Sequence, residues 1–301
     1  MQRSRKATHG AVTRFFSSIL PLKENDVPRL YHTPRHPRYD PETAVVEQIV
    51  LSVTGTPGVY SLIGYNRDEQ NTDAAMPLRR PPRTLCFLHR PFDLDRRAVR
   101  KGTLVLSSHT SFDEVLTVGW NPYLAERLSM NVVACLCIQG YKGKAGWDPD
   151  RKIGIMGQVT QHREMLVRRI QHEFGPMELV QEGLADEIHV VAIMNAFNEE
   201  QVHRVLDTAR EEGWVPPEGN GRNMLYLTGQ PRIAGLDAAQ AQGMSVVCVG
   251  HRQAEDWGIR YMANELRAAF PGVRVAEVYE EETSSVKPDK VHVVREAGES
   301  I

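Results

Sequence analysis

The chain has 301 residues, of which 41% are hydrophobic and 25% charged, and this length suffices for one large α/β domain or two average ones. Thirty-six lysines and arginines against 38 aspartates and glutamates give a formal net charge of -2. This balance excludes a chain-wide positive field for nucleic acid or an anionic membrane. The longest uncharged apolar stretch, residues 188–198, falls short of the ~18 residues of a membrane-spanning helix. We therefore expect a soluble protein, in which binding of a polyanion would need a local basic patch.

The first 23 residues carry five basic side chains and no acidic one. This composition is typical of a mitochondrial presequence, whereas the alternative interpretation is an irregular start followed by a helix at Ala11–Leu20. The four cysteines, Cys86, Cys135, Cys137 and Cys248, lie inside apolar runs rather than at framework spacings. They indicate buried thiols in a reducing compartment, which favours the cytoplasm.

Regular patterns run from residue 84 to the C-terminal region. Apolar runs of strand length predict strands at Thr84–Leu88, Thr103–Ser107, Val132–Ile138, Ile188–Met194, Asn223–Leu227, Ser245–Val249 and Val273–Val278. Helical spacing predicts helices at Gln158–Phe174, Glu199–Glu212, Ile233–Gln242 and Asp256–Phe270. Strands that are apolar on both faces and alternate with amphipathic helices favour an α/β fold with its sheets covered by helices.

Polar side chains come directly after four of these strands, where α/β sheets collect their ligands. His89 and Arg90 follow the first, His109 the second, Thr228-Gly229-Gln230 the fifth and His251 the sixth. His109 and Asp113, like His251 and Glu255, are four residues apart, so each pair shares one face if it lies on a helix. Imidazole and carboxylate together are a ligand set for Zn, Mn or Fe. The alternative is helix capping by Ser108, Thr110 and Asp113 with a solvated His109.

Four sequence blocks resemble the Ngg-one-interacting-factor-three-like proteins, a family also described as type 2 GTP cyclohydrolase I. They are His109-Thr110-Ser111-Phe112-Asp113, Arg151-Lys152-Ile153-Gly154, Leu225-Tyr226-Leu227-Thr228-Gly229 and Gly250-His251-Arg252-Gln253-Ala254-Glu255, in the family's order and spacing. The resemblance implies mixed sheets covered by helices, in two similar α/β lobes with a metal site between them. It assigns residues 84–157 to the first lobe and 158–301 to the second, after a divergent part at residues 1–83. It also implies a homo-oligomer, a hexamer or a dimer.

The family's metal ligands would correspond to His89, Asp113, His251 and Glu255, with His109 close by. The chain departs from the family at Arg90, where the family has a second histidine. A guanidinium offers no lone pair to a metal, so either one of two metal sites is weakened or His109 replaces the missing ligand. The resemblance thus implies one or two divalent cations (Zn, Fe or Mn) per chain.

These residues and the resemblance predict a metal-dependent hydrolase of a small-molecule substrate, anionic or nucleotide-like, because divalent cations lower the pKa of bound water towards ~7. His109 is then the expected general base or an orienting group, and Arg90 the clamp for an anionic substrate group. Lys142 and Lys144 in a glycine-bearing segment are expected to add a basic lid, with a solvated loop as the alternative. Two further hypotheses keep the metal: an iron-dependent redox enzyme on the same ligands, and a non-catalytic interaction protein with structural metals.

Overall fold

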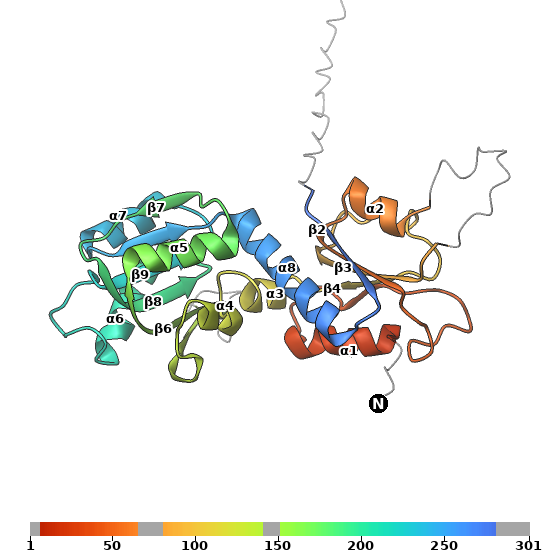
Figure 1. Cartoon of the computed structure of the whole chain (residues 1–301), viewed down its shortest axis with the longest axis horizontal. Coiled ribbons are helices and arrows are strands. Elements are labelled where there is room, and N and C mark those ends of the chain that lie inside the picture. The colour runs from red at the N-terminus through yellow and green to blue at the C-terminus, as the bar shows by residue number, and fades with distance from the viewer. Residues whose placement is uncertain (1–6, 66–80, 141–150, 281–301) are drawn as a thin grey trace, which may run out of the picture.

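The computed structural model describes residues 7–65, 81–140 and 151–280. They form two β-sheets with covering helices (Figure 1). The α-helices are α1 His9–Ile19, α2 Pro57–Ile63, α3 Thr110–Val115, α4 Pro122–Arg127, α5 Arg163–Phe174, α6 Glu199–Glu211, α7 Ile233–Ala241 and α8 His251–Ala269, and a 3-10 helix η2 spans Val132–Ala134. No helix in this described part has both the length and the apolar character that crossing a membrane requires.

The first sheet has the strand order β1-β4-β3-β2-β11. Its strands are β1 Leu30–His32, β2 Gln48–Thr54, β3 Thr84–Arg90, β4 Leu104–Ser107 and β11 Arg274–Val278. All neighbours pair in parallel except the edge strand β1. α1 and α8 cover one face and α2 the other, which explains why β2, β3 and β4 are apolar runs without alternation (Figure 1). The carboxyl ends of β3 and β4 consequently lie at one edge.

The second sheet has the order β5-β6-β8-β9-β10-β7. Its strands are β5 Leu136–Gln139, β6 Lys152–His162, β7 Leu179–Gln181, β8 Glu187–Met194, β9 Met224–Thr228 and β10 Ser245–Cys248. β8, β9 and β10 run parallel, whereas β5, β6 and β7 pair antiparallel with their neighbours. The mixed α/β sheets expected from the sequence are therefore confirmed.

The two sheets do not follow the residue boundaries that the resemblance implies for the lobes. β2 lies within residues 1–83 and β11 within residues 158–301, yet both belong to the first sheet. β6 runs across the boundary at residue 157. The first sheet thus takes strands from both ends of the chain, and the division at these residue numbers stays a prediction.

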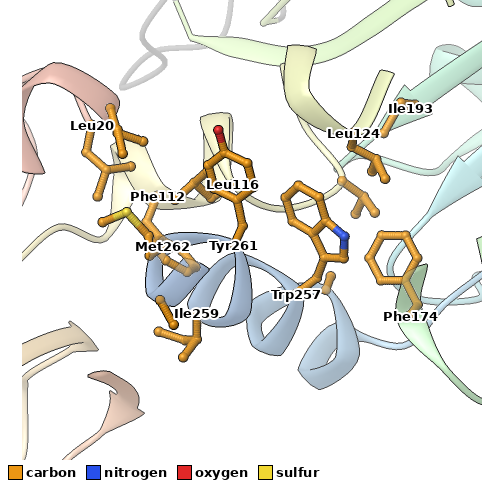
Figure 2. Packing of buried hydrophobic residues seen from close by; sticks show 14 of the residues in the cluster. Leu20, Phe112, Leu116, Leu124, Phe174, Ile193, Trp257, Ile259, Tyr261 and Met262 are labelled. Carbon is orange, nitrogen blue, oxygen red and sulfur yellow. The ribbon is translucent and has the colours of Figure 1, made fainter. Parts of the chain in front are cut away.

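Helix α8 joins the two sheets, since it begins after β10 of the second and leads to β11 of the first (Figure 1). In Figure 2 its Trp257 lies towards Phe174 and Leu124, and its Met262 towards Leu20 and Phe112. Trp257 is 2% exposed. One continuous hydrophobic core therefore runs from the first sheet through α8 to the second.

Gly258 lets α8 approach α3 closely. A Cβ atom at this position would lie 2.6 Å from the carbonyl oxygen of Leu116 and 2.6 Å from Phe112 Cζ. A side chain there would force the two helices apart, because real Cβ atoms do not approach other atoms so closely. The absence of a side chain at residue 258 consequently sets the spacing between these helices.

Most predicted elements match the structure within one to three residues, but three predictions differ. The predicted helix Gln158–Phe174 is wrong in its first turn, because residues 158–162 complete β6, which pairs with β8. The predicted strand Val132–Ile138 begins instead as η2 and becomes extended only at Leu136. The helix predicted from Asp256 begins earlier, at His251, so it carries the second histidine–carboxylate pair itself.

All four cysteines are free thiols, as the sequence predicts. Cys86 and Cys248 are buried, and burial raises the pKa of the Cys248 thiol to about 12. Cys135 and Cys137 are only half-buried, because they lie near the edge strand β5 rather than in the centre of a sheet.

Candidate metal centre

His89 lies at the carboxyl end of β3 with its side chain fully buried. Its Nδ1 atom is 3.1 Å from the carbonyl oxygen of Ser108, which only accepts, so Nδ1 carries the proton in this contact. The other ring nitrogen, Nε2, lies 3.2 Å from Asp113 Oδ1 and 3.3 Å from Glu255 Oε1. One imidazole nitrogen therefore faces two carboxylates, and its partner nitrogen fixes the orientation of the ring.

The side chain of Asp26 caps the start of α3. Its carboxylate accepts hydrogen bonds of 2.7 to 3.2 Å from the N–H groups of His109, Thr110 and Ser111 and from the Ser108 hydroxyl. Burial raises the pKa of Asp26, but these hydrogen bonds outweigh burial and lower it below its usual value. Sequence reasoning missed Asp26, because its partners lie 82 to 85 residues further along the chain and no local pattern connects them.

The helix that Asp26 caps carries His109 and Asp113 on one face, as their spacing predicts. His109 Nδ1 lies 3.8 Å from Asp113 Oδ2, and the His109 ring centroid is 4.8 Å from that of His89. Donor atoms of His89, His109 and Asp113 all lie within 4.8 Å of one another. The capping alternative is wrong in its residues, because Asp26 and not Ser108, Thr110 or Asp113 binds the free N–H groups. His109 is also half-buried rather than solvated.

The second pair comes from the first turns of α8. Gly250 has φ +99°, a conformation that glycine adopts without strain, and it lets α8 begin three residues after β10 ends. His251 Nε2 lies 3.4 Å from Glu255 Oε1, the oxygen that also faces His89. The second oxygen of Glu255, Oε2, accepts a hydrogen bond from Arg90 Nη2 at 3.2 Å. The buried carboxylate thus points one oxygen at two imidazoles and the other at a guanidinium.

Three buried polar atoms at this point make no hydrogen bond among the described residues: His89 Nε2, His109 Nδ1 and Glu255 Oε1. Buried polar atoms without hydrogen bonds are uncommon, and each one calls for an explanation such as an ion. Imidazole nitrogens and carboxylate oxygens are ligands for Zn, Mn and Fe. The residues present therefore fit a divalent cation, and the cluster of His89, His109 and Asp113 could hold one.

The electrostatics of the cluster favour positive charge. Burial lowers the pKa of His89, but the carboxylates of Asp113 and Glu255 outweigh burial and raise that pKa to about 9. Burial raises the pKa of Glu255, yet the two histidines beside it hold it well below its usual range. The contact with Glu255 raises the pKa of His251, whereas burial lowers that of His109. Two carboxylates thus create a place for a cation between them.

A cavity of about 200 Å³ opens beside these residues. Asp113, His251 and Glu255 line it from α3 and α8. Other lining residues come from the second sheet, near the carboxyl ends of β8 and β9: Arg151, Asn195, Phe197, Thr228, Gly229, Gln230 and Arg232. The carboxyl ends of parallel strands in both sheets therefore meet at one cavity, as ligand sites of α/β sheets do.

The structure brings together six of the eight residues that sequence analysis selected: His89, Arg90, His109, Asp113, His251 and Glu255. Lys142 and Lys144 lie outside the described residues. The basic side chains that line the cavity are instead Arg151 and Arg232. Arg151 belongs to a block already noted in the sequence and Arg232 comes after the Thr228-Gly229-Gln230 turn, so proximity to these motifs was a usable signal for both.

The sequence profile of the family described as Duf34/NIF3 (NGG1p interacting factor 3) matches residues 91–208. No curated protein matches the chain in sequence. The matched segment contains His109 and Asp113, whereas His89, His251 and Glu255 lie outside it.

Several solved structures share the fold across nearly the whole chain. The Bacillus cereus protein related to NIF3 is 12% identical, with a TM-score of 0.52, and the match covers 94% of this chain and 99% of that one. Reduced HcgD from Methanocaldococcus jannaschii is 14% identical, with a TM-score of 0.56 and coverage of 91% and 99%. Staphylococcus aureus hypothetical protein SA1388 is 13% identical, with a TM-score of 0.56 and coverage of 94% and 98%. Residues 91–208 thus resemble the Duf34/NIF3 family in sequence, and the chain shares its fold with these solved structures.

Proposed function

We propose that this protein is a metal-dependent hydrolase acting on a small molecule at the cavity between the two sheets. The observation that carries the proposal is the convergence of His89, His109, Asp113 and Glu255, three of which present buried, unbonded donor atoms to one another. A purely structural metal would need no adjoining cavity. The cavity beside the carboxylates supports a reaction on a bound substrate.

The ligands of the cation in this proposal are His89, His109 and Asp113, completed by Glu255. A divalent cation held in this way lowers the pKa of water to about 7, which makes hydroxide available at neutral pH. His251 is the more exposed of the two helix histidines, at 56%, and it lines the cavity. We assign to His251 Nε2, which faces Glu255 Oε1, the acceptance and release of a proton during hydrolysis.

Arg90 orients Glu255 in this proposal. Its hydrogen bond to Oε2 neutralises one side of the carboxylate and leaves the other side, Oε1, to the imidazoles. The expectation that Arg90 binds a substrate anion stays a prediction. Because Glu255 shares its charge with a guanidinium, we expect one cation per chain rather than two.

Elemental analysis of protein purified without added metal tests the site. We expect about one Zn, Mn or Fe per chain in the wild type and much less in His89→Asn and Glu255→Gln. The controls are His172→Asn, at a histidine side chain that is 88% exposed, and Glu164→Gln, at a glutamate side chain that is 64% exposed. Metal retained in both site variants contradicts the proposed ligands. Two metals per chain in Arg90→His would show that Arg90 is what limits the wild type to one.

Hydrolysis is tested on the same proteins with p-nitrophenyl phosphate, bis(p-nitrophenyl) phosphate and p-nitrophenyl acetate. We expect turnover of at least one of them, its loss after chelation and its return on adding the metal. The site variants should lose turnover while their circular dichroism stays that of the wild type. A coloured iron protein that consumes oxygen and hydrolyses none of these esters would replace the proposal with the redox alternative.

Homo-oligomer formation remains a prediction from the family resemblance. Sedimentation velocity of the purified chain measures it directly. A hexamer or dimer would agree with that prediction, and a monomer would contradict it.

A further inference from the structure

The part of the cavity lining that comes from the second sheet, here called the basic wall, carries cationic and neutral side chains. Arg151 and Arg232 are its charged members, and Asn195, Thr228 and Gln230 are its polar neutral ones. All the carboxylates that line the cavity, those of Asp113 and Glu255, come from the other wall. The cavity is therefore divided between an acidic wall and a basic wall.

Arg151 is a half-buried arginine that pairs with no carboxylate of the described residues. Its Nε atom is buried and makes no hydrogen bond within the described part of the chain. Its main chain is fixed, since its carbonyl oxygen accepts a hydrogen bond from Gly140 N–H at 2.6 Å just before β6 begins. Burying a guanidinium nitrogen without a partner costs stability, so this side chain is placed for a ligand.

One helix directs further positive charge to the basic wall. α7 begins directly after Arg232, and it has neither a side-chain hydrogen bond at its cap nor an acidic residue in its first turn. Unbonded N–H groups at a helix start carry about half a positive elementary charge. They add to the field of Arg151 and Arg232, which supply the specific donors.

We propose that Arg151 and Arg232 bind a phosphate group of the substrate. This inference rests on the proposed function, because it assigns the substrate class of that hydrolase: a small phosphorylated molecule whose phosphate lies against the basic wall. Guanidinium groups bind phosphate oxygens by paired, charge-assisted hydrogen bonds. The cavity of about 200 Å³ is smaller than the ~300 to 1,000 Å³ of pockets for drug-sized ligands, which matches a small substrate.

The carboxylates of Asp113 and Glu255 would repel an anion across so small a cavity. Arg90 neutralises part of the charge of Glu255, and the proposed cation neutralises more. Phosphate should therefore bind more tightly to the metal-loaded protein than to the metal-free protein, while depending on the two arginines in both forms.

Isothermal titration calorimetry with inorganic phosphate tests the inference on metal-loaded and metal-free protein. Arg151→Ala and Arg232→Ala should each weaken phosphate binding about tenfold, the equivalent of ~1.4 kcal/mol. The metal content should not change in either variant. Arg168→Ala, at a guanidinium that is 67% exposed on α5, is the matched control and should bind phosphate as the wild type does.

Arg151→Lys keeps the charge but loses the planar donor pair, so we expect an intermediate loss of affinity. Arg232 is exposed, and its variant should fold even if Arg151→Ala does not. No phosphate binding by the wild type, or equal binding by wild type and both arginine variants, overturns the inference. If the protein takes up metal and hydrolyses an ester but binds phosphate independently of the two arginines, the proposed function is supported and this inference is contradicted. Arginine-dependent phosphate binding by a protein that takes up no metal would support this inference and contradict the proposed metal-dependent hydrolase.

Discussion

The two sheets contribute differently to one cavity. The first sheet and α3 supply His89 and Asp113, held by short contacts within a buried cluster, whereas the second sheet supplies Arg151 and Arg232 without carboxylate partners among the described residues. Only α8 serves both, through His251 and Glu255 at its start and Trp257 in the core. In the proposed function, metal binding therefore depends on the first sheet with α3, and phosphate recognition on the second sheet. We call these two parts the first and the second scaffold, and substitutions should be able to change one function without the other.

The greatest loss of stability should come from separating the two scaffolds. Trp257→Ala removes a ring that stacks on Tyr261 at 5.4 Å and donates its Nε1–H to Glu173 of α5 at 2.9 Å. Removal of a buried tryptophan costs about 3 to 5 kcal/mol of unfolding free energy. Urea unfolding followed by circular dichroism measures the loss. A loss below about 1 kcal/mol would show that α8 does not join the sheets as the core suggests.

A smaller effect belongs to the first scaffold alone. The Lys23 ammonium forms an ion pair with Glu114 on α3, and the glutamate side chain is 1% exposed. Lys23→Met leaves the Glu114 carboxylate buried without its partner, which should cost about 3 kcal/mol. The double variant Lys23→Met with Glu114→Gln should recover part of that stability in the same denaturation assay. Equal stability of wild type and single variant would contradict a buried pair.

A pH effect of similar or lesser size arises at His9, also on the first scaffold. His9 is 2% exposed, lies 3.0 Å from the Tyr39 hydroxyl, and burial lowers its pKa to about 4. The unfolded chain, with a pKa near 6.5, binds this proton more readily, so stability falls as the pH drops below ~6.5 and levels off below ~4.

The loss attributable to His9 should reach up to about 3 kcal/mol at pH 4. Denaturant unfolding at a series of pH values shows it as a slope that His9→Asn reduces. His172→Asn, at the exposed histidine, should keep the wild-type slope. An unchanged slope in His9→Asn would exclude this histidine as the source.

The smallest effect on stability tests the independence of the two scaffolds most directly. Asp26→Asn keeps the size of the side chain but removes the charge that four donors share, which should cost about 1 to 2 kcal/mol. Because α3 then loses its anchor, metal affinity should fall as well. Phosphate binding to the metal-free protein should stay unchanged, since the basic wall belongs to the other sheet. A parallel loss of both would show that the scaffolds are not independent.

The sequence predicts the parts of the site that depend on local rules. His89, His109 and His251 all lie at or just after the ends of strands, and the four-residue spacing of His109 with Asp113 and of His251 with Glu255 places each pair on one helix face. Periodicity does not say which strands of different sheets face each other. The meeting of His89 with Glu255, on a helix far along the chain, was expected from the rule that ligands collect at the carboxyl ends of α/β strands and from the family resemblance.

Errors arose where distant partners override local preference. Residues 158–162 continue the helical pattern of residues 163–174, but pairing with β8 holds them in a strand. The same limit explains why Asp26 was missed: most of its hydrogen-bond partners are main-chain groups, which leave no trace in the side-chain pattern. The sequence predicts a basic lid at Lys142 and Lys144 because of the neighbouring glycines, and that segment lies outside the described residues.

The close approach of α8 to α3 at Gly258 has a consequence for the selectivity of the proposed metal site. Asp113 lies on α3 and Glu255 lies less than one turn before Gly258 on α8, so the gap between these helices determines how far apart the two carboxylates are. The substitution Gly258→Ala would widen the gap between the helices without changing any of the proposed metal ligands. Larger ions with longer bonds, such as Mn²⁺ or Ca²⁺, should then gain over Zn²⁺, which makes residue 258 the natural starting point for changing the ionic radius that the protein accepts.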